Sequence, residues 1–179
     1  ARRVADGDRE AAVAADRDAM GNGQLAKIVE HHPGLPFPKD VDIIVGGGGQ
    51  DSGQVAIQKD LLAIGDTLHA LAENGTPMLM ICGLYQLFGR FFKTSDGALI
   101  QGIGIFHAET HGGPRRFIGN TTVNSKQFGE LIGYENHSGL TILDNNQPAL
   151  GKVIRGKGNN GEDGTEEDKD QAERHDAGL

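Results

Sequence analysis

A strand, a helix and a second strand follow one another in the first half of the chain, and this order most constrains the fold. Residues 41–45 include four apolar side chains, a pattern typical of a buried strand. A helix is predicted next, because apolar residues recur at intervals of four and three. A second short strand is predicted over residues 78–81. Strands joined by a helix run parallel, so the sequence predicts an α/β fold with a parallel core. The helical apolar positions are Ile57, Leu61, Ile64, Leu68 and Leu71.

The only cysteine, Cys82, directly follows the second predicted strand. The apolar spacing of residues 87–92 favours the first turns of a helix behind it. At such a turn, backbone N–H groups and the helix dipole favour the reactive thiolate. Gly83 tolerates the sharp backbone of a nucleophile elbow. Cysteine is also a common inert core residue, which is the alternative interpretation.

A run of four glycines, residues 46–49, leaves the first predicted strand at the same sheet edge as Cys82. Its N–H groups and that of Gly83 could together stabilise the oxyanion of an attacked carbonyl. A flexible turn is the alternative. A phosphate-binding loop is disfavoured, because no Gly-Lys-Ser/Thr follows the run. The pattern therefore predicts acyl transfer at Cys82.

Length and composition narrow the class of protein. A chain of 179 residues fits a single domain, taken as residues 1–179. Its net charge of −8 disfavours a nucleic-acid partner. One cysteine excludes an internal disulfide and fits a reducing compartment, so a cytoplasmic location is expected. No apolar run approaches the roughly 18 residues of a membrane span, and the first 30 residues lack a signal segment.

From residue 97 onward the pattern changes to short extended pieces separated by glycine, proline or asparagine. These pieces predict antiparallel strands appended to the parallel core. Toward the ends, residues 11–20 could form a helix and residues 25–30 a strand, while residues 166–179 are expected to be a solvated helix or disordered. The extended pieces are residues 102–110, 117–124, 132–135, 141–143 and 152–155.

Four motifs in sequence order resemble those of the glutaminase subunits of lipid II isoglutaminyl synthase, the GatD family. That family belongs to the class I glutamine amidotransferases of the cobyric-acid-synthase type. The resemblance covers about residues 39–165, and residues 1–38 and 166–179 are atypical. The motifs are Gly47-Gly48-Gly49-Gln50-Asp51, Ile81-Cys82-Gly83-x-Tyr85-Gln86, Gly133-Tyr134-Glu135-Asn136-His137-Ser138-Gly139, and Gly156-x-Gly158-Asn159-Asn160-Gly161-Glu162-Asp163-Gly164.

The resemblance implies a class I glutamine amidotransferase-like sheet and a role for each matched residue. Cys82 would attack the side-chain amide of glutamine, forming a thioester and releasing ammonia. The N–H groups of Gly83 and Gly48 would hold the oxyanion. Gln86 and Arg116 would bind the substrate, with Arg115 a possible alternative to Arg116. No metal ligand is implied, and His31, His32, His107 and His111 lack metal-ligand spacing and are expected at the surface.

The resemblance also implies a partner. Ammonia would pass to a Mur-ligase-like subunit, MurT, in a heterodimer. That subunit would use ATP and Mg²⁺ to amidate D-glutamate of lipid II to D-isoglutamine during peptidoglycan synthesis. This chain would need no cofactor of its own and would meet lipid II only through the partner.

Two features depart from the family pattern. Leu84 replaces a second glycine in the elbow and is expected to narrow the pocket. The family's catalytic histidine, in a Tyr-x-His-Gly-Pro-like stretch, has no match, and His175 is the only histidine after residue 165. Two alternatives therefore stand beside a glutaminase subunit. One is a non-catalytic relative that docks on a ligase, and the other is a cobyric-acid-synthase-type amidotransferase with another acceptor.

Three consecutive residues, Glu135, Asn136 and His137, resemble an acid–amide–imidazole set. Neighbours along a strand alternate between its two faces, so the three cannot all converge on one point. They are interpreted as a structural network. Arg116 could likewise be an ordinary surface residue.

Overall fold

The computed structural model describes residues 28–48 and 51–161. These residues group into two compact units, which are treated separately below. The first contains residues up to 92 together with 99–106, and the second contains 93–98 and residues from 107 onward. The expected helix at 11–20 and the segment 166–179 lie outside the described residues, as does most of the strand expected at 25–30; its last three residues, 28–30, are not in a strand.

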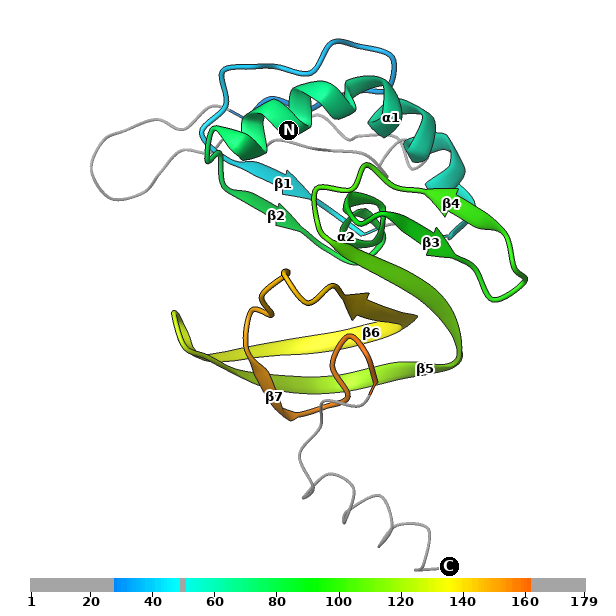
Figure 1. Cartoon of the computed structure of the whole chain (residues 1–179), viewed down its shortest axis with the longest axis vertical. Helices are drawn as coiled ribbons and strands as arrows, with labels where there is room; N and C mark the ends of the chain where they lie inside the picture. Colours follow the sequence, from blue (N-terminus) through cyan, green and yellow to red (C-terminus); the bar gives the residue numbers. More distant parts are fainter. Residues whose placement is uncertain (1–27, 49–50, 162–179) are drawn as a thin grey trace, which may run out of the picture. The chain divides into compact units, whose positions relative to one another are not determined.

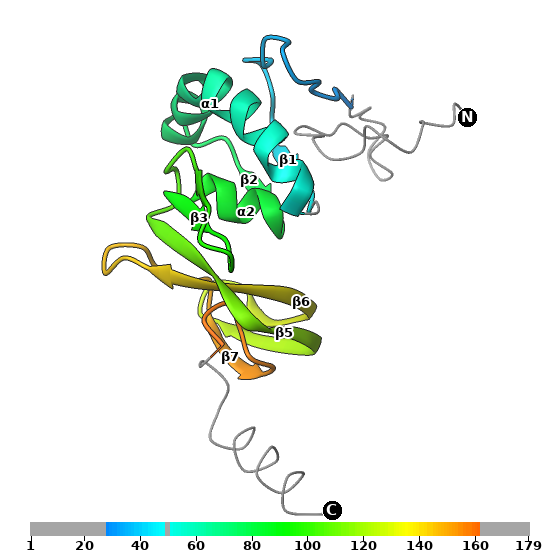
Figure 2. The same cartoon turned by 90° about the vertical axis from the view of Figure 1, so that its right-hand side faces the viewer.

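The first unit contains the predicted strand–helix–strand arrangement. Strand β1 (Ile44–Gly46) pairs in parallel with β2 (Met78–Met80), and the helix α1 (Asp51–Glu73) connects them. In both views α1 runs alongside the strand pair (Figures 1 and 2). The expected parallel pairing is confirmed. Each strand is shorter than its apolar run.

Helix α1 buries the predicted apolar face. All five positions, from Ile57 to Leu71, are buried. Gly75, at a φ of 82°, follows the helix, and the Thr76 N–H donates to the Leu71 carbonyl at 3.0 Å. This is a Schellman ending, in which glycine takes the left-handed position that other residues avoid. The chain is thereby turned back toward β2.

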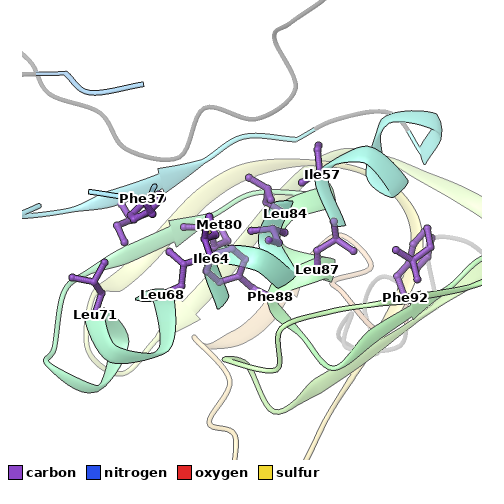
Figure 3. Close-up of a cluster of buried hydrophobic side chains, with 13 residues drawn as sticks. Phe37, Ile57, Ile64, Leu68, Leu71, Met80, Leu84, Leu87, Phe88 and Phe92 are labelled. Carbon is purple, nitrogen blue, oxygen red and sulfur yellow. The ribbon is translucent and has the colours of Figure 1, made fainter. Parts of the chain in front are cut away.

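The core of the first unit lies between α1, the strand pair and the short helix α2 (Gly83–Phe88). Figure 3 shows these side chains gathered together. Leu68, Leu87 and Phe88 are fully buried. Full burial of such a side chain contributes about 1.5–3 kcal/mol. The cluster also includes Phe37, Ile44, Ile57, Leu61, Ile64, Leu71, Met80, Leu84, Phe92 and Ile100.

The helix expected through residues 87–92 is shorter than predicted, and its last residues form a strand. Helix α2 ends at Phe88, Gly89 is extended, and β3 (Phe91–Lys93) begins two residues later. Strand β4 (Leu99–Gln101) lies beside β3. The Gly102 N–H donates to the Arg90 carbonyl at 2.9 Å. Pairing with β4, a long-range interaction, therefore overrides the helical spacing of the phenylalanines.

The second unit is a long antiparallel ribbon. Strand β5 (Ala108–Ser125) pairs with β6 (Gly129–Leu143), and β7 (Lys152–Arg155) pairs with the other side of β5 (Figure 1). The expected pieces at 117–124, 132–135 and 141–143 lie within β5 and β6, and the piece at 152–155 has the predicted bounds. The piece expected at 102–110 is wrong over residues 102–107, which form no strand, since β5 begins only at Ala108. The pieces at 132–135 and 141–143 belong to one strand, because cross-strand bonds continue through Gly133 and Gly139.

The pairing of β5 with β6 has one irregularity. Its register runs without a break from Ala108 opposite Leu143 to Gly112 opposite Gly139, and resumes with Phe117 opposite His137. Residues 113–116 of β5 therefore face Ser138 alone. This insertion is a β-bulge, a feature that bends a strand and redirects its side chains.

Candidate active site

Cys82 has a backbone conformation that residues with a side chain rarely adopt. Its φ is 54° and its ψ is −113°, and it is the only non-glycine residue with a positive φ in the described part of the chain. The residue sits between β2 and α2 and is exposed. Such strain persists only where the surrounding structure enforces it, and it clusters at functional sites. The sharp strand-to-helix turn at Cys82 is the geometry of a nucleophile elbow.

The loop that leaves β1 passes against Cys82. A Cβ atom placed on Gly48 would lie 2.8 Å from the Cys82 Cβ and 3.4 Å from its Sγ. A separation below 3.0 Å is not tolerated between such atoms, so only glycine fits there. The same construction on Gly47 meets nothing within 4 Å. The expected meeting of the two loops at one sheet edge is thus present in the structure.

The start of α2 lies directly behind the thiol. Gly83, the first helical residue, is buried, and its N–H is among those without an intrahelical acceptor. Gln86 is half-buried one turn later, and its N–H donates to the Cys82 carbonyl at 3.2 Å. The structure brings Gly48, Cys82 and Gly83 together. Their oxyanion role, and the substrate role of Gln86, stay predictions.

Leu84 does not narrow a pocket as the sequence comparison suggested. Its side chain is 2% exposed and belongs to the core of the first unit. A Cβ placed on Gly46 would approach the Leu84 Cδ1 to 2.6 Å. Leucine at this position therefore packs the elbow against the end of β1.

Arg116, the predicted substrate residue, belongs to the second unit and lies within the bulge of β5. It is exposed, and its Nε donates to the Asn136 Oδ1 at 2.7 Å. The adjacent Arg115 is also exposed. The bond to Asn136 therefore distinguishes Arg116 from Arg115. Its binding of substrate stays a prediction.

Glu135 anchors the glycine-rich loop after β7. Its carboxylate accepts hydrogen bonds from the N–H groups of Lys157, at 3.0 and 3.2 Å, and Gly158, at 3.1 Å. Gly156 has a φ of 98°, and a Cβ there would lie 3.0 Å from the Glu135 Oε1. His137 lies on the same face, with its Nε2 3.9 Å from the carboxylate. The interpretation as a structural network is confirmed for these contacts.

Replacing Glu135 with glutamine is expected to lower the free energy of unfolding by about 1.5–3 kcal/mol, the range for hydrogen bonds to a charged group. The side chain is only 9% exposed, so solvent compensates little. The side-chain NH₂ of glutamine would also place hydrogen-bond donors against the backbone N–H groups of Lys157 and Gly158. Urea denaturation measures the change. Glu130, exposed on the same strand, provides the control Glu130→Gln, which should change stability by less than about 0.5 kcal/mol. Equal effects of the two substitutions would contradict the anchoring role.

The expectation that His31 is a surface residue is wrong. Its ring is buried, and its Nε2 lies 2.7 Å from the Asp60 Oδ2 on α1. The Asp60 Oδ1 accepts the Gly34 N–H at 2.8 Å, so the pair fixes the loop before β1 onto the helix. His32 and His107 are exposed, as expected. Within residues 28–48 and 51–161, no group of three or more side chains could hold a metal ion.

Two side-chain contacts were not foreseen from the sequence, namely Asn136 with Arg116 and Glu135 with the loop at 157–158. Alternation along a strand separates Asn136 from its neighbours, but it does not identify a partner 20 residues away. The bulge that redirects Arg116 could have been suspected from Pro114, since proline cannot donate to a ladder.

His175, the only histidine after residue 165, lies outside the described residues. Among the helices that the structure describes, none combines the length and the apolar character that a membrane crossing requires.

Comparison with known proteins agrees with the resemblance seen in the motifs. Residues 16–174 match the family of CobB/CobQ-like glutamine amidotransferase domains. The chain is 39% identical over 130 residues to the GatD subunit of lipid II isoglutaminyl synthase (glutamine-hydrolyzing) from Staphylococcus aureus, covering 73% of this chain and 52% of that protein. It is 38% identical over 123 residues to the same subunit from Streptococcus pneumoniae, covering 68% and 47%.

A probable cobyric acid synthase from Methanococcus maripaludis is 30% identical over 160 residues, covering 82% of this chain and 30% of that protein. The chain therefore spans about half the length of the two synthase subunits and a smaller share of the cobyric acid synthase.

Proposed function

The chain belongs to the CobB/CobQ-like glutamine amidotransferase family, and on that premise we propose that it hydrolyses glutamine at Cys82 and supplies the ammonia to a ligase partner. The observation that carries this proposal is the positive φ of Cys82 with Gly48 held against it. An inert cysteine has no need of a strained backbone on an exposed turn. A nucleophile does, because the turn presents its sulfur to a substrate.

In the proposed reaction, the Cys82 thiolate attacks the side-chain amide carbon of glutamine. A carbon–sulfur bond forms, the carbon–nitrogen bond breaks, and the protonated nitrogen leaves as ammonia. Water then attacks the thioester, which releases glutamate and restores the thiol. The N–H groups of Gly83 and Gly48 would stabilise the oxyanion in both steps. One such donor typically contributes about 10²–10³-fold in rate.

Substrate binding is assigned to Arg116 and Gln86. Glutamine carries an α-carboxylate, and guanidinium groups bind carboxylates through two parallel hydrogen bonds. Arg116 is exposed and already oriented by Asn136, which supports this assignment over Arg115. Gln86, one turn along α2 from Cys82, would contact the polar end of the substrate near the reacting amide.

The partner and acceptor follow from the relatives named GatD. The acceptor would be D-glutamate of lipid II, amidated to D-isoglutamine by a Mur-ligase-like subunit, MurT, in a heterodimer. That subunit would hold the ATP and Mg²⁺, and the reaction at Cys82 would use no cofactor of this chain. A cytoplasmic location, expected from the single cysteine, belongs to the same proposal.

The identity with cobyric acid synthases favours a second candidate, in which the ammonia goes to a different acceptor. Affinity purification of the tagged full chain separates the two candidates. Recovery of a Mur-like ligase supports amidation of lipid II. Recovery of a different ligase overturns that acceptor and leaves the glutaminase assignment in place.

A glutamine-derived electrophile, such as a diazoketone or chloroketone analogue, tests the proposed chemistry directly. Mass spectrometry should find a single adduct on Cys82, and added glutamine should slow its formation. A rate no faster than that of a free cysteine peptide would instead favour a non-catalytic relative that docks on a ligase. The peptide control matters because an exposed thiol reacts slowly with any electrophile.

A further inference from the structure

The turn at Cys82 is fixed by backbone hydrogen bonds on both sides. Before the cysteine, the Ile81 N–H donates to the Gly46 carbonyl at 2.9 Å, which extends the pairing of β1 with β2. After it, the Gln86 N–H donates to the Cys82 carbonyl at 3.2 Å. A positive φ on a residue with a side chain persists only where the surroundings enforce it. The strained turn therefore needs a support that keeps β1 and α2 in place.

The far end of α2 is held by residues 102–106, which belong to the same unit. The Ile103 N–H donates to the Leu87 carbonyl at 2.8 Å, and the Phe106 N–H donates to the Phe88 carbonyl at the same distance. Carbonyls in the last turn of a helix have no acceptor role within the helix, so these bonds fix its end. Helix α2 cannot turn away from Cys82 to relieve the strain without breaking them.

Leu84 fills the space between α2 and the end of β1. A Cβ placed on Gly46 would lie 2.6 Å from the Leu84 Cδ1 and 2.6 Å from the Met80 Sδ. Gly46 lies in β1 and does not have a positive φ, so lack of space, and not backbone conformation, excludes a side chain there. The Leu84 side chain is buried within the core (Figure 3). It therefore packs directly against the backbone of Gly46.

The same two segments meet a second time at the thiol. Gly48 is two residues after Gly46 and lies against Cys82, which is two residues before Leu84. The contact of Leu84 with Gly46 thus neighbours the contact of Cys82 with Gly48. A cavity left by a smaller core side chain is partly filled by movement of its surroundings. Truncation of Leu84 would therefore let the end of β1 shift relative to α2, and Gly48 would shift with it.

We propose that Leu84 is a positioning residue. Its side chain sets the separation of β1 from α2, and it thereby holds Cys82 at its positive φ with Gly48 against the thiol. The inference rests on the proposed function where it concerns catalysis, because Cys82 is there the nucleophile and Gly48 an oxyanion donor. Leu84 itself is buried and acts only through these two residues.

Steady-state glutamine hydrolysis by the full chain tests the proposal. Leu84→Ala should lower kcat about 10–100-fold and leave KM within about threefold, since a displacement of about 1 Å at the reacting atoms costs up to about 10²-fold. Leu84→Met, which conserves volume, should keep kcat within about threefold of the wild type.

Leu68→Ala is the matched control, because Leu68 is a buried leucine of the same core on α1. It should lower the melting temperature about as much as Leu84→Ala does, yet keep kcat within about threefold at a temperature where both variants are folded. Equal losses of kcat in the two variants would overturn the positioning role. If Leu84→Ala does not fold, Leu84→Val and Leu68→Val make the same comparison with a smaller loss of volume.

An exchange of side-chain size shows whether Leu84 acts through Gly46. Gly46→Ala alone should lower kcat, because the added Cβ collides with Leu84. In a Leu84→Ala background that Cβ would lie 3.4 Å from the Cβ of residue 84, an ordinary contact, and the flexible Met80 can move into the vacated space. The double variant should therefore be about tenfold more active than either single variant. Additive losses would contradict the proposal.

Crystal structures of the variants separate the inference from the catalytic proposal, because they require no turnover. Cys82 should adopt a negative φ in Leu84→Ala and keep its positive φ in Leu68→Ala. If the wild type fails to hydrolyse glutamine but φ changes in Leu84→Ala alone, the reaction assignment fails and the positioning of the turn by Leu84 survives. If Cys82 keeps its positive φ in Leu84→Ala, the positioning role is overturned whatever the activity of the wild type.

Discussion

Replacement of Cys82 by alanine is expected to abolish glutamine-dependent amidation by the assembled complex, with a loss of about 10⁴–10⁶-fold. Removing the nucleophile of an enzyme that works through a covalent intermediate has effects of this order. Alanine keeps the Cβ, so the strain in the backbone at the elbow is unchanged and the fold should stay intact. The rate is measured as acceptor amidated per minute with glutamine as the nitrogen source.

Ammonia provides the control for this variant. With ammonium salt in place of glutamine, Cys82→Ala should support the same amidation rate as the wild type, because the partner then receives its nitrogen from solution. Loss of both activities would mean that Cys82 holds the complex together, and the assignment of the thiol as nucleophile would fail.

Gly48→Ala is expected to lower kcat for glutamine hydrolysis by about 10²–10³-fold. The added Cβ would lie 2.8 Å from the Cys82 Cβ, so either the loop or the cysteine must move. A shifted loop would withdraw the proposed oxyanion donor, whose loss costs a factor of this size. Steady-state kinetics should show the change in kcat more than in KM, since the donor acts on the transition state.

Gly47→Ala is the matched control for this effect. A Cβ on Gly47 meets nothing within 4 Å, so the neighbouring glycine can be replaced without contact. Its kcat should stay within about threefold of the wild type. If both variants lose activity equally, the loop acts through general flexibility, and a specific contact of Gly48 with Cys82 does not explain the loss.

The first unit was largely predictable because its signals are local. The apolar spacing of α1 identifies the buried face from Ile57 to Leu71, and Gly75 marks its end. Strand–helix–strand order is enough to predict parallel pairing, and parallel pairing predicts that the two glycine-containing turns meet. The contact between Gly48 and Cys82 follows from that chain of inference.

The misses arise where distant residues decide the structure. Phe91 and Phe92 have helical spacing with Leu87 and Phe88, yet they pair as a strand because Gly89 ends the helix and β4 lies alongside. The buried position of His31 depends on Asp60, 29 residues further along. No local sequence pattern identifies such a partner, since a histidine at the start of a proline-containing segment is equally compatible with a surface loop.

In the second unit, too, the contacts between residues distant in the sequence could not be predicted. Its strands were expected, but their continuity through Gly133 and Gly139 comes from cross-strand bonds that override weak strand propensity. The pairing of Asn136 with Arg116 depends on a register that the bulge alters by several residues. Register of this kind is set by the whole ribbon and cannot be read from either strand alone.

The backbone conformation at Cys82 exposes the thiol but lowers the stability of the fold. A φ of 54° with a ψ of −113° costs any residue with a side chain about 1–3 kcal/mol, and glycine nearly nothing. A chain with glycine there should therefore melt at a higher temperature than the natural one while being inert toward glutamine.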